Sequence, residues 1–328
     1  MKAWIIDGFI GIDHLRLADL PDPVPEEGEA ILEVHYAGLN PADRYLAEGQ
    51  YPAKPPLPHI LGREGIGTVV QVGTGVSEVR VGDRRAILRG ETGVERPGTF
   101  ARQVAVQVQN LVEIPARWSE LEAAGATLVY LTAYQALTMW GPLAPASAVL
   151  VTGASGGVGV ATVQLAAALS HPVFALSRSA EKSERLRQLG ATAAFNPEDP
   201  RWRHAVKALL APRRVDLAID TIGGKLLPEV IDTLGECGKV SLVGRLAGPV
   251  PSFNTAALFF RRIRMGGVAV GACTTAESRA SWRLLLDLLS RSGARPQVDN
   301  IFAFDQLPKA FECLAQGPMG KVLLAVRE

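Results

Sequence analysis

Residues 149–160 constrain what this chain can fold into more than any other segment. They read VLVTGASGGVGV, and a helix-prone, alanine-rich segment follows over residues 161–168. A buried strand that runs into glycines lets the backbone approach a phosphate, and the next helix points its free N–H groups and positive dipole end at it. The segment therefore predicts a dinucleotide-binding turn, made by Ser155, Gly156, Gly157, Val158 and Gly159.

Two other kinds of strand–turn–helix site fit the same letters. Residues 153–157 satisfy the G-x-S-x-G pattern of serine hydrolases, with Ser155 as the nucleophile. Residues 152–159 look like the glycine turn of short-chain dehydrogenases, and Ala154 stands where a strict G-x-G-x-x-G motif has its first glycine. The motif alone does not decide between these sites.

The position of the turn and the residues after it separate the alternatives. Short-chain dehydrogenases begin with this turn and place a catalytic Tyr, with Lys four positions on, behind it, whereas all five tyrosines here precede it. A hydrolase needs an acid and then a His after its serine. Only His171 and His204 follow Ser155, and His204 falls on the polar face of a predicted amphipathic helix. The short-chain family is therefore excluded, and the hydrolase has little support.

The composition favours a small-molecule partner. A chain of 328 residues suits about two domains. Its 34 basic and 33 acidic residues give a formal net charge of +1, which offers no field for nucleic acid or acidic lipid. The three cysteines, Cys237, Cys273 and Cys313, are far apart and support neither a disulfide framework nor a metal knuckle. We expect a protein of the reducing cytoplasm.

No segment predicts a membrane span. The N-terminus starts with a strand-like run and shows no apolar signal region with a cleavage site. Residues 123–177 carry no charge, but prolines and glycines interrupt them, so no continuous apolar run of about 20 residues exists. We interpret this uncharged span as the buried centre of a fold.

Two patterns of secondary structure divide the chain. Up to about residue 120, short β-like runs alternate with Pro and Gly turns, and Ser119 with Glu122 forms a capping box for a first helix. From residue 148, strands and helices alternate, which predicts a parallel sheet with ligands at the carboxyl ends of its strands. The final strand, over residues 321–326, is expected to return to the first domain.

Several motifs, in order along nearly the whole chain, resemble the medium-chain dehydrogenase/reductase superfamily, specifically its zinc-free quinone oxidoreductase branch. Besides the glycine turn, they are residues 38–43 (GLNPAD), 49–52 (GQYP), 61–67 (LGREGIG), 81–84 (VGDR) and 131–134 (LTAY). The resemblance implies an α/β fold in which a Rossmann domain, a doubly wound parallel sheet, is inserted in a GroES-like, β-rich catalytic domain. We expect the catalytic domain over residues 1–125 and 268–328, and the NADP-binding domain over 126–267.

The resemblance also implies that no metal is bound. In the zinc alcohol dehydrogenases of the superfamily, a Cys, a His and a second Cys occupy the positions of Asn40, Arg63 and Leu128. An amide, a guanidinium and an aliphatic chain cannot replace thiolate and imidazole around Zn²⁺. Without a Lewis acid to stabilise an alkoxide, activated double bonds become better substrates than alcohols.

The end of the second strand favours NADPH over NADH. NAD enzymes place an Asp or Glu about 20 residues beyond the glycines, whereas this chain has Ser177, Arg178 and, further on, Lys182. Hydroxyls and cations bind a 2′-phosphate that a carboxylate would repel. The alternative is that both cations are solvated residues at a helix start. An Asn followed by Pro197, where relatives often carry Tyr, departs from the family pattern.

Further site residues follow from the resemblance. It implies that Asn40 and Thr132 line the nicotinamide pocket, although each could instead satisfy backbone groups. Arg63 could offer its charge to a substrate oxygen or form a salt bridge with Glu64 or Asp43. We also predict cofactor contacts by three residues in the second half of the chain, one of which could equally be an exposed surface lysine: Val243, Gly244 and Lys321.

Tyr51 carries the most specific catalytic hypothesis. Residues 49–55 look like the segment that supplies a proton-donating Tyr in mitochondrial-type 2-enoyl thioester reductases, relatives in the same superfamily. A phenol can protonate the enolate that hydride addition leaves behind. Quinone reductases often have a Tyr there too, so a packed loop aromatic is the alternative.

Together these features predict an NADPH-dependent, zinc-independent oxidoreductase that transfers hydride to a quinone or an α,β-unsaturated carbonyl. One alternative is a 2-enoyl thioester reductase. Another, from a different class, is a non-catalytic NADPH-binding protein that resembles the lens crystallins of this branch. The resemblance implies a homodimer or homotetramer, for which the edge at residues 264–270 is a candidate.

Overall fold

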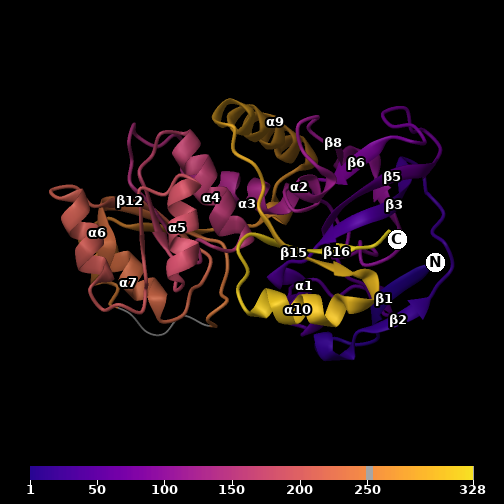
Figure 1. Ribbon diagram of the computed structural model, residues 1–328, viewed down its shortest axis with the longest axis horizontal. Coiled ribbons are helices and arrows are strands. Elements are labelled where there is room, and N and C mark those ends of the chain that lie inside the picture. The colour runs from indigo at the N-terminus through magenta and orange to yellow at the C-terminus, as the bar shows by residue number, and fades with distance from the viewer. Residues whose placement is uncertain (249–253, 328) are drawn as a thin grey trace. The chain divides into compact units, whose positions relative to one another are not determined.

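The computed structural model describes residues 1–248 and 254–327, and the chain divides into two units (Figure 1). Unit 1 comprises the described residues of Met1–Leu128, Cys273–Arg279 and Arg295–Glu328, so it contains both ends of the chain. Unit 2 comprises those of Val129–Ala272 and Ala280–Ala294. No helix in the described part of the chain is long and apolar enough to cross a membrane.

Unit 2 is built on a parallel sheet of six strands in the order β11-β10-β9-β12-β13-β14. Numbered from β9, this is the 3-2-1-4-5-6 order of dinucleotide-binding folds. The predicted doubly wound parallel sheet is therefore confirmed. The strands are β9 (Val149–Val151), β10 (Val173–Leu176), β11 (Ala193–Phe195), β12 (Val215–Asp220), β13 (Leu234–Leu242) and β14 (Arg264–Gly267).

Helices connect successive strands of this sheet. One hydrophobic cluster joins Leu150, Phe174 and Val240 of the strands to Trp202 and Val230 of two helices, so these helices cover one face. The unit contains α4 (Gly157–Ala168), α5 (Ala180–Gln188), α6 (Trp202–Leu210), α7 (Leu226–Thr233), α8 (Ala256–Phe260) and most of α3 (Thr127–Thr138) and α9 (Thr275–Ser292).

Unit 1 holds two antiparallel-rich sheets. The larger has the order β15-β16-β3-β5-β6-β8, with β7 also paired to β3, and the smaller has the order β2-β1-β4. The strands are β1 (Lys2–Ile6), β2 (Arg16–Asp19), β3 (Glu29–Gly38), β4 (His59–Ile60), β5 (Glu64–Val72), β6 (Arg84–Ile87), β7 (Gln103–Gln107), β8 (Leu111–Glu113), β15 (Val298–Ala303) and β16 (Lys321–Ala325).

The last strand, β16, pairs antiparallel with β3, which brings residues near the C-terminus beside residues 36–38. Helices α1 (Pro41–Ala47), α2 (Glu120–Ala124) and α10 (Leu307–Ala315) complete the unit. Ser119 caps α2 as predicted, since its hydroxyl accepts from Glu122 N and its own N–H donates to the Glu122 carboxylate. Leu32, Phe100 and Phe311 belong to one buried core, to which β3, α1 and α10 contribute.

The grouping of α9 differs from the expected boundary. The sequence placed all of 268–328 with the catalytic domain, whereas the structure groups Ala280–Ala294 with unit 2. Within this stretch Trp282, Leu285 and Leu289 are buried. These buried side chains form the apolar face of an amphipathic helix.

The turn after β9 depends on two glycines for different reasons. Gly153 has a φ of +55°, in the left-handed region that favours glycine. Gly159, inside α4, lies so close to the preceding turn that a Cβ would be 2.3 Å from the Gly153 carbonyl oxygen. The helix can therefore pack on the strand only with glycine at position 159.

We predict that Gly159→Ala destabilises the protein by about 1–3 kcal/mol or more, because the backbone must move to admit the methyl group. Gly156→Ala is the matched control, since a Cβ there would meet nothing closer than the Gly153 oxygen at 3.5 Å. Equilibrium urea denaturation measures both variants. Equal midpoints for Gly159→Ala and the wild type would contradict the packing argument.

Candidate functional site

A buried carboxylate at the start of β5 organises the polar residues of unit 1. The Glu64 side chain is fully buried, and its Oε1 accepts from Asn40 Nδ2 at 2.9 Å and from the Lys321 ammonium. Its Oε2 accepts from Leu128 N at 3.1 Å and from Thr127 Oγ1 at 3.5 Å. The last two donors lie at the N-terminus of α3, where a negative charge is favourable. Glu64 thus joins three segments that are remote in the sequence.

Lys321, the first residue of β16, is only 3% exposed and pairs with this carboxylate. Its ammonium also donates to Leu39 O at 2.7 Å and to Asn40 Oδ1 at 2.8 Å. These three protein acceptors match the three donors of an ammonium group. Lys321 is therefore not an exposed surface lysine, and its contact with a cofactor stays a prediction.

Asn40 is held on both sides of its carboxamide. Its amide nitrogen donates to Glu64 and its oxygen accepts from Lys321, while its backbone N–H donates to Asp43 Oδ2 at 2.9 Å. Asn40 is also the N-cap residue of α1. The alternative, that Asn40 satisfies backbone groups, describes only the longer contact from Nδ2 to Gly38 O at 3.4 Å. The contact of Asn40 with nicotinamide stays a prediction.

Arg63 pairs with Asp43, one of the two partners considered. Arg63 Nε donates to Asp43 Oδ1 at 3.3 Å, and one terminal nitrogen donates to Ala42 O at 3.0 Å. Burial raises the pKa of the Asp43 carboxyl to about 6, although the nearby Arg63 cation acts to lower it. Asp43 is therefore mainly ionised at neutral pH, with Arg63 as its counterion.

Tyr51 lies against the same guanidinium. The Arg63 Cζ atom is 4.2 Å from the centre of the Tyr51 ring, a cation–π distance. The loop is fixed by Lys54, whose ammonium donates to Gly49 O at 2.6 Å and to Tyr51 O at 3.2 Å. Tyr51 is also partly buried and packs against the core of unit 1. Its ring therefore fits the alternative, a packed loop aromatic. The role of its hydroxyl as a proton donor stays a prediction.

The glycine turn of unit 2 fits a phosphate. Gly156 is the N-cap of α4, and no side chain caps the first turn of this helix. The first N–H groups of a helix lack intrahelical partners. A Cβ at position 156 would meet little of the protein, so internal packing does not require glycine there. Glycine at this position instead leaves space in front of the helix. Ser155 lies in the turn, Gly157 and Val158 are the first two residues of α4, and their contacts with a phosphate stay predictions.

The residues after β10 lie at the same sheet edge as the glycine turn, because β9 and β10 are parallel neighbours. Ser177 is buried, and Arg178 is exposed. Ser179 caps α5 by accepting from Lys182 N at 3.2 Å. Among the described residues Arg178 makes no ion pair, so its cation can take an anionic ligand.

Sequence reasoning missed a polar contact beside the turn. Thr152 Oγ1, at the end of β9, donates to Asp220 Oδ1 at 2.6 Å, at the end of β12. The buried Asp220 carboxylate also accepts from Gly223 N at 3.1 Å and Ile222 N at 3.2 Å. An Asp directly before Thr-Ile-Gly-Gly was the available signal. This contact joins the two strands between which the strand order reverses.

The remaining predicted residues also belong to unit 2. Val243 and Gly244 directly follow β13, and their N–H groups donate to Asp220 O at 2.8 and 3.3 Å. They therefore lie at the carboxyl edge of the sheet, on the loop next to β12. Thr132 lies within α3 and is 9% exposed. Their contacts with a cofactor stay predictions.

The positions of the family's zinc ligands do not fit a zinc ion. The Asn40 carboxamide is bonded to Glu64 and Lys321, Arg63 supplies a cation, and Leu128 is aliphatic. None of these groups provides a thiolate or imidazole. Among the described residues no group of three or more His, Cys, Asp or Glu side chains could hold a metal ion.

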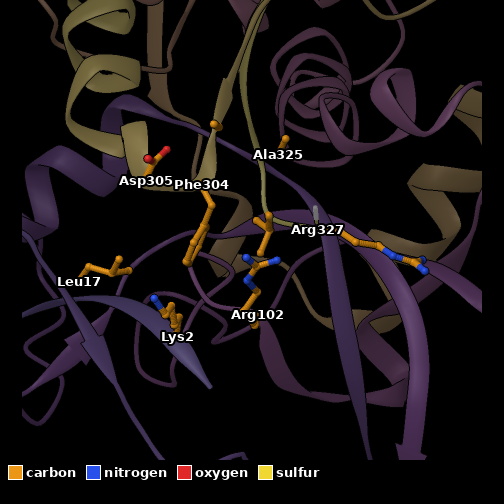
Figure 2. Close-up of a pocket in the computed structure, with 9 residues that line it drawn as sticks. Lys2, Leu17, Arg102, Phe304, Asp305, Ala325 and Arg327 are labelled. Carbon is orange, nitrogen blue, oxygen red and sulfur yellow. The ribbon is translucent and has the colours of Figure 1, made fainter.

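Unit 1 also has a surface pocket of about 410 Å³ that contains none of the predicted site residues (Figure 2). Figure 2 shows Arg102 beside Phe304, and the Arg102 Cζ atom is 5.2 Å from the centre of that ring. The lining residues are Lys2, Leu17, Arg102, Ala303, Phe304, Asp305, Ala325, Val326 and Arg327.

Comparisons with known proteins bear on both units. The family model "Alcohol dehydrogenase GroES-like domain" matches residues 26–116, and the model "Zinc-binding dehydrogenase" matches residues 157–291. The human synaptic vesicle membrane protein VAT-1 homolog is 30% identical over 345 residues, which cover 99% of this chain and 86% of the relative. The quinone oxidoreductase of Lama guanicoe is 28% identical over 330 residues, which cover 100% of this chain and 98% of the relative. The chain belongs to the medium-chain dehydrogenase/reductase superfamily, in its quinone oxidoreductase branch.

Solved structures of this superfamily share the fold. An NAD-dependent alcohol dehydrogenase superposes with a TM-score of 0.90 at 28% identity, with 100% of both chains covered. Mycobacterial Rv1454c, solved in complex with NADPH, has a TM-score of 0.89 at 26% identity, with 99% of both chains covered. The predicted GroES-like domain and Rossmann sheet are thus confirmed, and the recognition of the superfamily from its motifs was correct.

We predict that Lys321→Met lowers the free energy of unfolding by about 3–5 kcal/mol, because it leaves the Glu64 carboxylate buried without its counterion. The double variant Glu64→Gln/Lys321→Met should recover part of this loss, since the amide keeps an acceptor for Leu128 N. Urea denaturation measures both. Wild-type stability of the single variant would contradict the assigned ion pair.

Proposed function

We propose that this protein is an NADPH-dependent oxidoreductase that transfers hydride to a quinone or an α,β-unsaturated carbonyl without a bound zinc ion. The observation that carries the proposal is the end of β10, where Ser177 and the exposed Arg178 occupy the place of the acidic residue of NAD enzymes. A relative of the same fold, mycobacterial Rv1454c, was solved with NADPH.

The chain offers complementary groups for each part of this cofactor. The uncapped N-terminus of α4 faces the pyrophosphate with N–H groups, and Gly156 leaves room for it. Arg178 supplies a guanidinium for the 2′-phosphate, with Lys182 in the first turn of α5. When bound, NADPH supplies the hydride.

The proposed substrates suit a site without a Lewis acid. Quinones and enones carry an electron-poor carbon that accepts hydride directly, whereas alcohol oxidation by the zinc members of the superfamily relies on the metal to stabilise the alkoxide. Arg63 and Asn40, at the positions of two zinc ligands, instead bond to Asp43, Glu64 and Lys321. Relatives named quinone oxidoreductase support the same class of substrate.

A second candidate, 2-enoyl thioester reduction, is favoured by one observation. The loop that carries Tyr51 is anchored by Lys54, and the ring lies on Arg63. A phenol held in this way is suited to give its proton to the α-carbon of an enolate. Quinone reduction does not require a proton at carbon, so only the reduction of enones and enoyl thioesters is expected to need Tyr51.

NADPH oxidation with a panel of acceptors tests the function: benzoquinone, naphthoquinone, a simple enone and an enoyl thioester. We expect turnover with at least one quinone or the enone, and NADPH used in preference to NADH. Turnover with the thioester alone would favour the second candidate. Tight NADPH binding without oxidation by any acceptor would contradict both and favour a non-catalytic protein.

We predict that Arg178→Ala weakens NADPH binding by about 1.5–3 kcal/mol and changes NADH binding little, because a charge-assisted bond to the 2′-phosphate is lost. Arg185→Ala, further along α5, is the control and should bind both cofactors as the wild type does. Fluorescence titration gives the dissociation constants. Equal losses for both cofactors would remove the 2′-phosphate assignment.

We predict that Tyr51→Phe lowers kcat for the enone and the enoyl thioester by about 10²-fold or more, because the proton donor is lost. Quinone reduction and NADPH affinity should stay near wild type. Tyr36→Phe, on β3 of the same unit, controls for the loss of a phenol elsewhere. If Tyr51→Phe reduces the thioester at the wild-type rate, the acid role is wrong.

A further inference from the structure

Arg63 is a buried cation with donors to spare. Its side chain is only 9% exposed. Nε is used by Asp43 and Nη2 by Ala42 O, and no described residue accepts a hydrogen bond from Nη1. Arg63 Nη1 is not among the fully buried side-chain nitrogens that lack a partner, so it belongs to the exposed part of the guanidinium. This donor is therefore open to an acceptor outside the chain.

The Arg63–Asp43 pair has a polarity. Asp43 is fully buried and also accepts from Asn40 N, whereas Arg63 keeps some exposure. The negative end of the pair is therefore inside unit 1, and its positive end is the part that a ligand can reach. A charge fixed in this way costs no reorganisation when a negative charge develops beside it.

Tyr51 adds a second donor next to this cation. Its ring lies 4.2 Å from Arg63 Cζ, and Lys54 holds the loop backbone on either side of the ring. We propose that Arg63 Nη1 and the Tyr51 hydroxyl form a binding site for a carbonyl oxygen that becomes an oxyanion during reduction. This inference rests on the proposed function and assigns its substrates to conjugated carbonyl compounds.

The chemistry at this site balances as follows. Hydride from NADPH forms a bond to the β-carbon, the C=C electron pair shifts to join the α-carbon to the carbonyl carbon, and the C=O pair moves to oxygen. Arg63 donates hydrogen bonds to this oxygen and keeps its protons. The Tyr51 proton then bonds to the α-carbon as the C=O bond re-forms, and solvent reprotonates the tyrosinate. The products are the saturated carbonyl compound and NADP⁺.

A stable phenolate tests the site without turnover. The probe is 4-nitrophenolate, titrated by absorbance above the pKa of the free phenol, with neutral 4-nitroanisole as the uncharged comparison. We expect Arg63→Met to bind the phenolate about tenfold or more weakly and 4-nitroanisole as the wild type does. Arg63→Lys keeps the charge but loses the planar, forked set of guanidinium donors, so its phenolate affinity should lie between those of Arg63→Met and the wild type. Arg44→Met, an exposed arginine of α1 paired with Glu48, is the control.

The single variant Arg63→Met leaves the buried Asp43 carboxylate unpaired and could fail to fold. The double variant Arg63→Met/Asp43→Asn removes this carboxylate and serves as the second test. It should show the same tenfold loss of phenolate binding. Equal phenolate affinity in the wild type and in the folded Arg63 variants would overturn the site. If the wild type reduces no carbonyl acceptor but the phenolate result holds, the oxyanion site stands and the proposed function fails. If turnover is normal in every Arg63 variant and phenolate binding is unchanged, the proposed function stands and the oxyanion site fails.

Discussion

The buried Glu64 carboxylate is the interaction on which the rest of unit 1 depends. It joins Lys321 of the last strand, 257 residues away in sequence, to Asn40 at the start of α1 and to the N-terminus of α3. A carboxylate out of water is stable only when it is paired and fully hydrogen-bonded, and Glu64 meets both conditions. The start of α1, which carries Asn40 and Asp43, is therefore held in one place, and Asp43 in turn holds Arg63.

The same network accounts for a family member whose ligand positions suit no zinc ion. Asn40 faces inward to Glu64 and Lys321, and Arg63 is bound to Asp43. In our proposal these internal bonds keep the shape of the catalytic unit, and the Arg63 cation supplies the positive charge for the reaction. Substrates then have to be electrophilic at carbon already, as quinones and enones are. In the same proposal the cofactor binds to unit 2, where the β9–α4 turn and the end of β10 offer N–H groups and a cation.

Local patterns predicted most of unit 2 and much less of the polar network. The glycine turn and the alternation of strands and helices predicted the parallel sheet. Both the phosphate-binding motif and the hydrophobic periodicity depend on residues that are close together in the sequence. The partners of Lys321 and Arg63 could not be chosen from the sequence, since they depend on which distant strands become neighbours. The Thr152–Asp220 contact and the grouping of α9 with unit 2 were missed for the same reason. The bond between Ser119 and Glu122 was predicted correctly, because these residues are only three positions apart in the sequence.

The central claim of this account is hydride transfer without a bound metal. Zinc content and NADPH oxidation by the best quinone or enone acceptor, measured on the same chelator-treated preparation, test it most directly. The account predicts far less than one zinc ion per chain and an unchanged rate after treatment with the chelator. One zinc ion per chain, whose removal abolishes turnover and whose return restores it, would contradict the account.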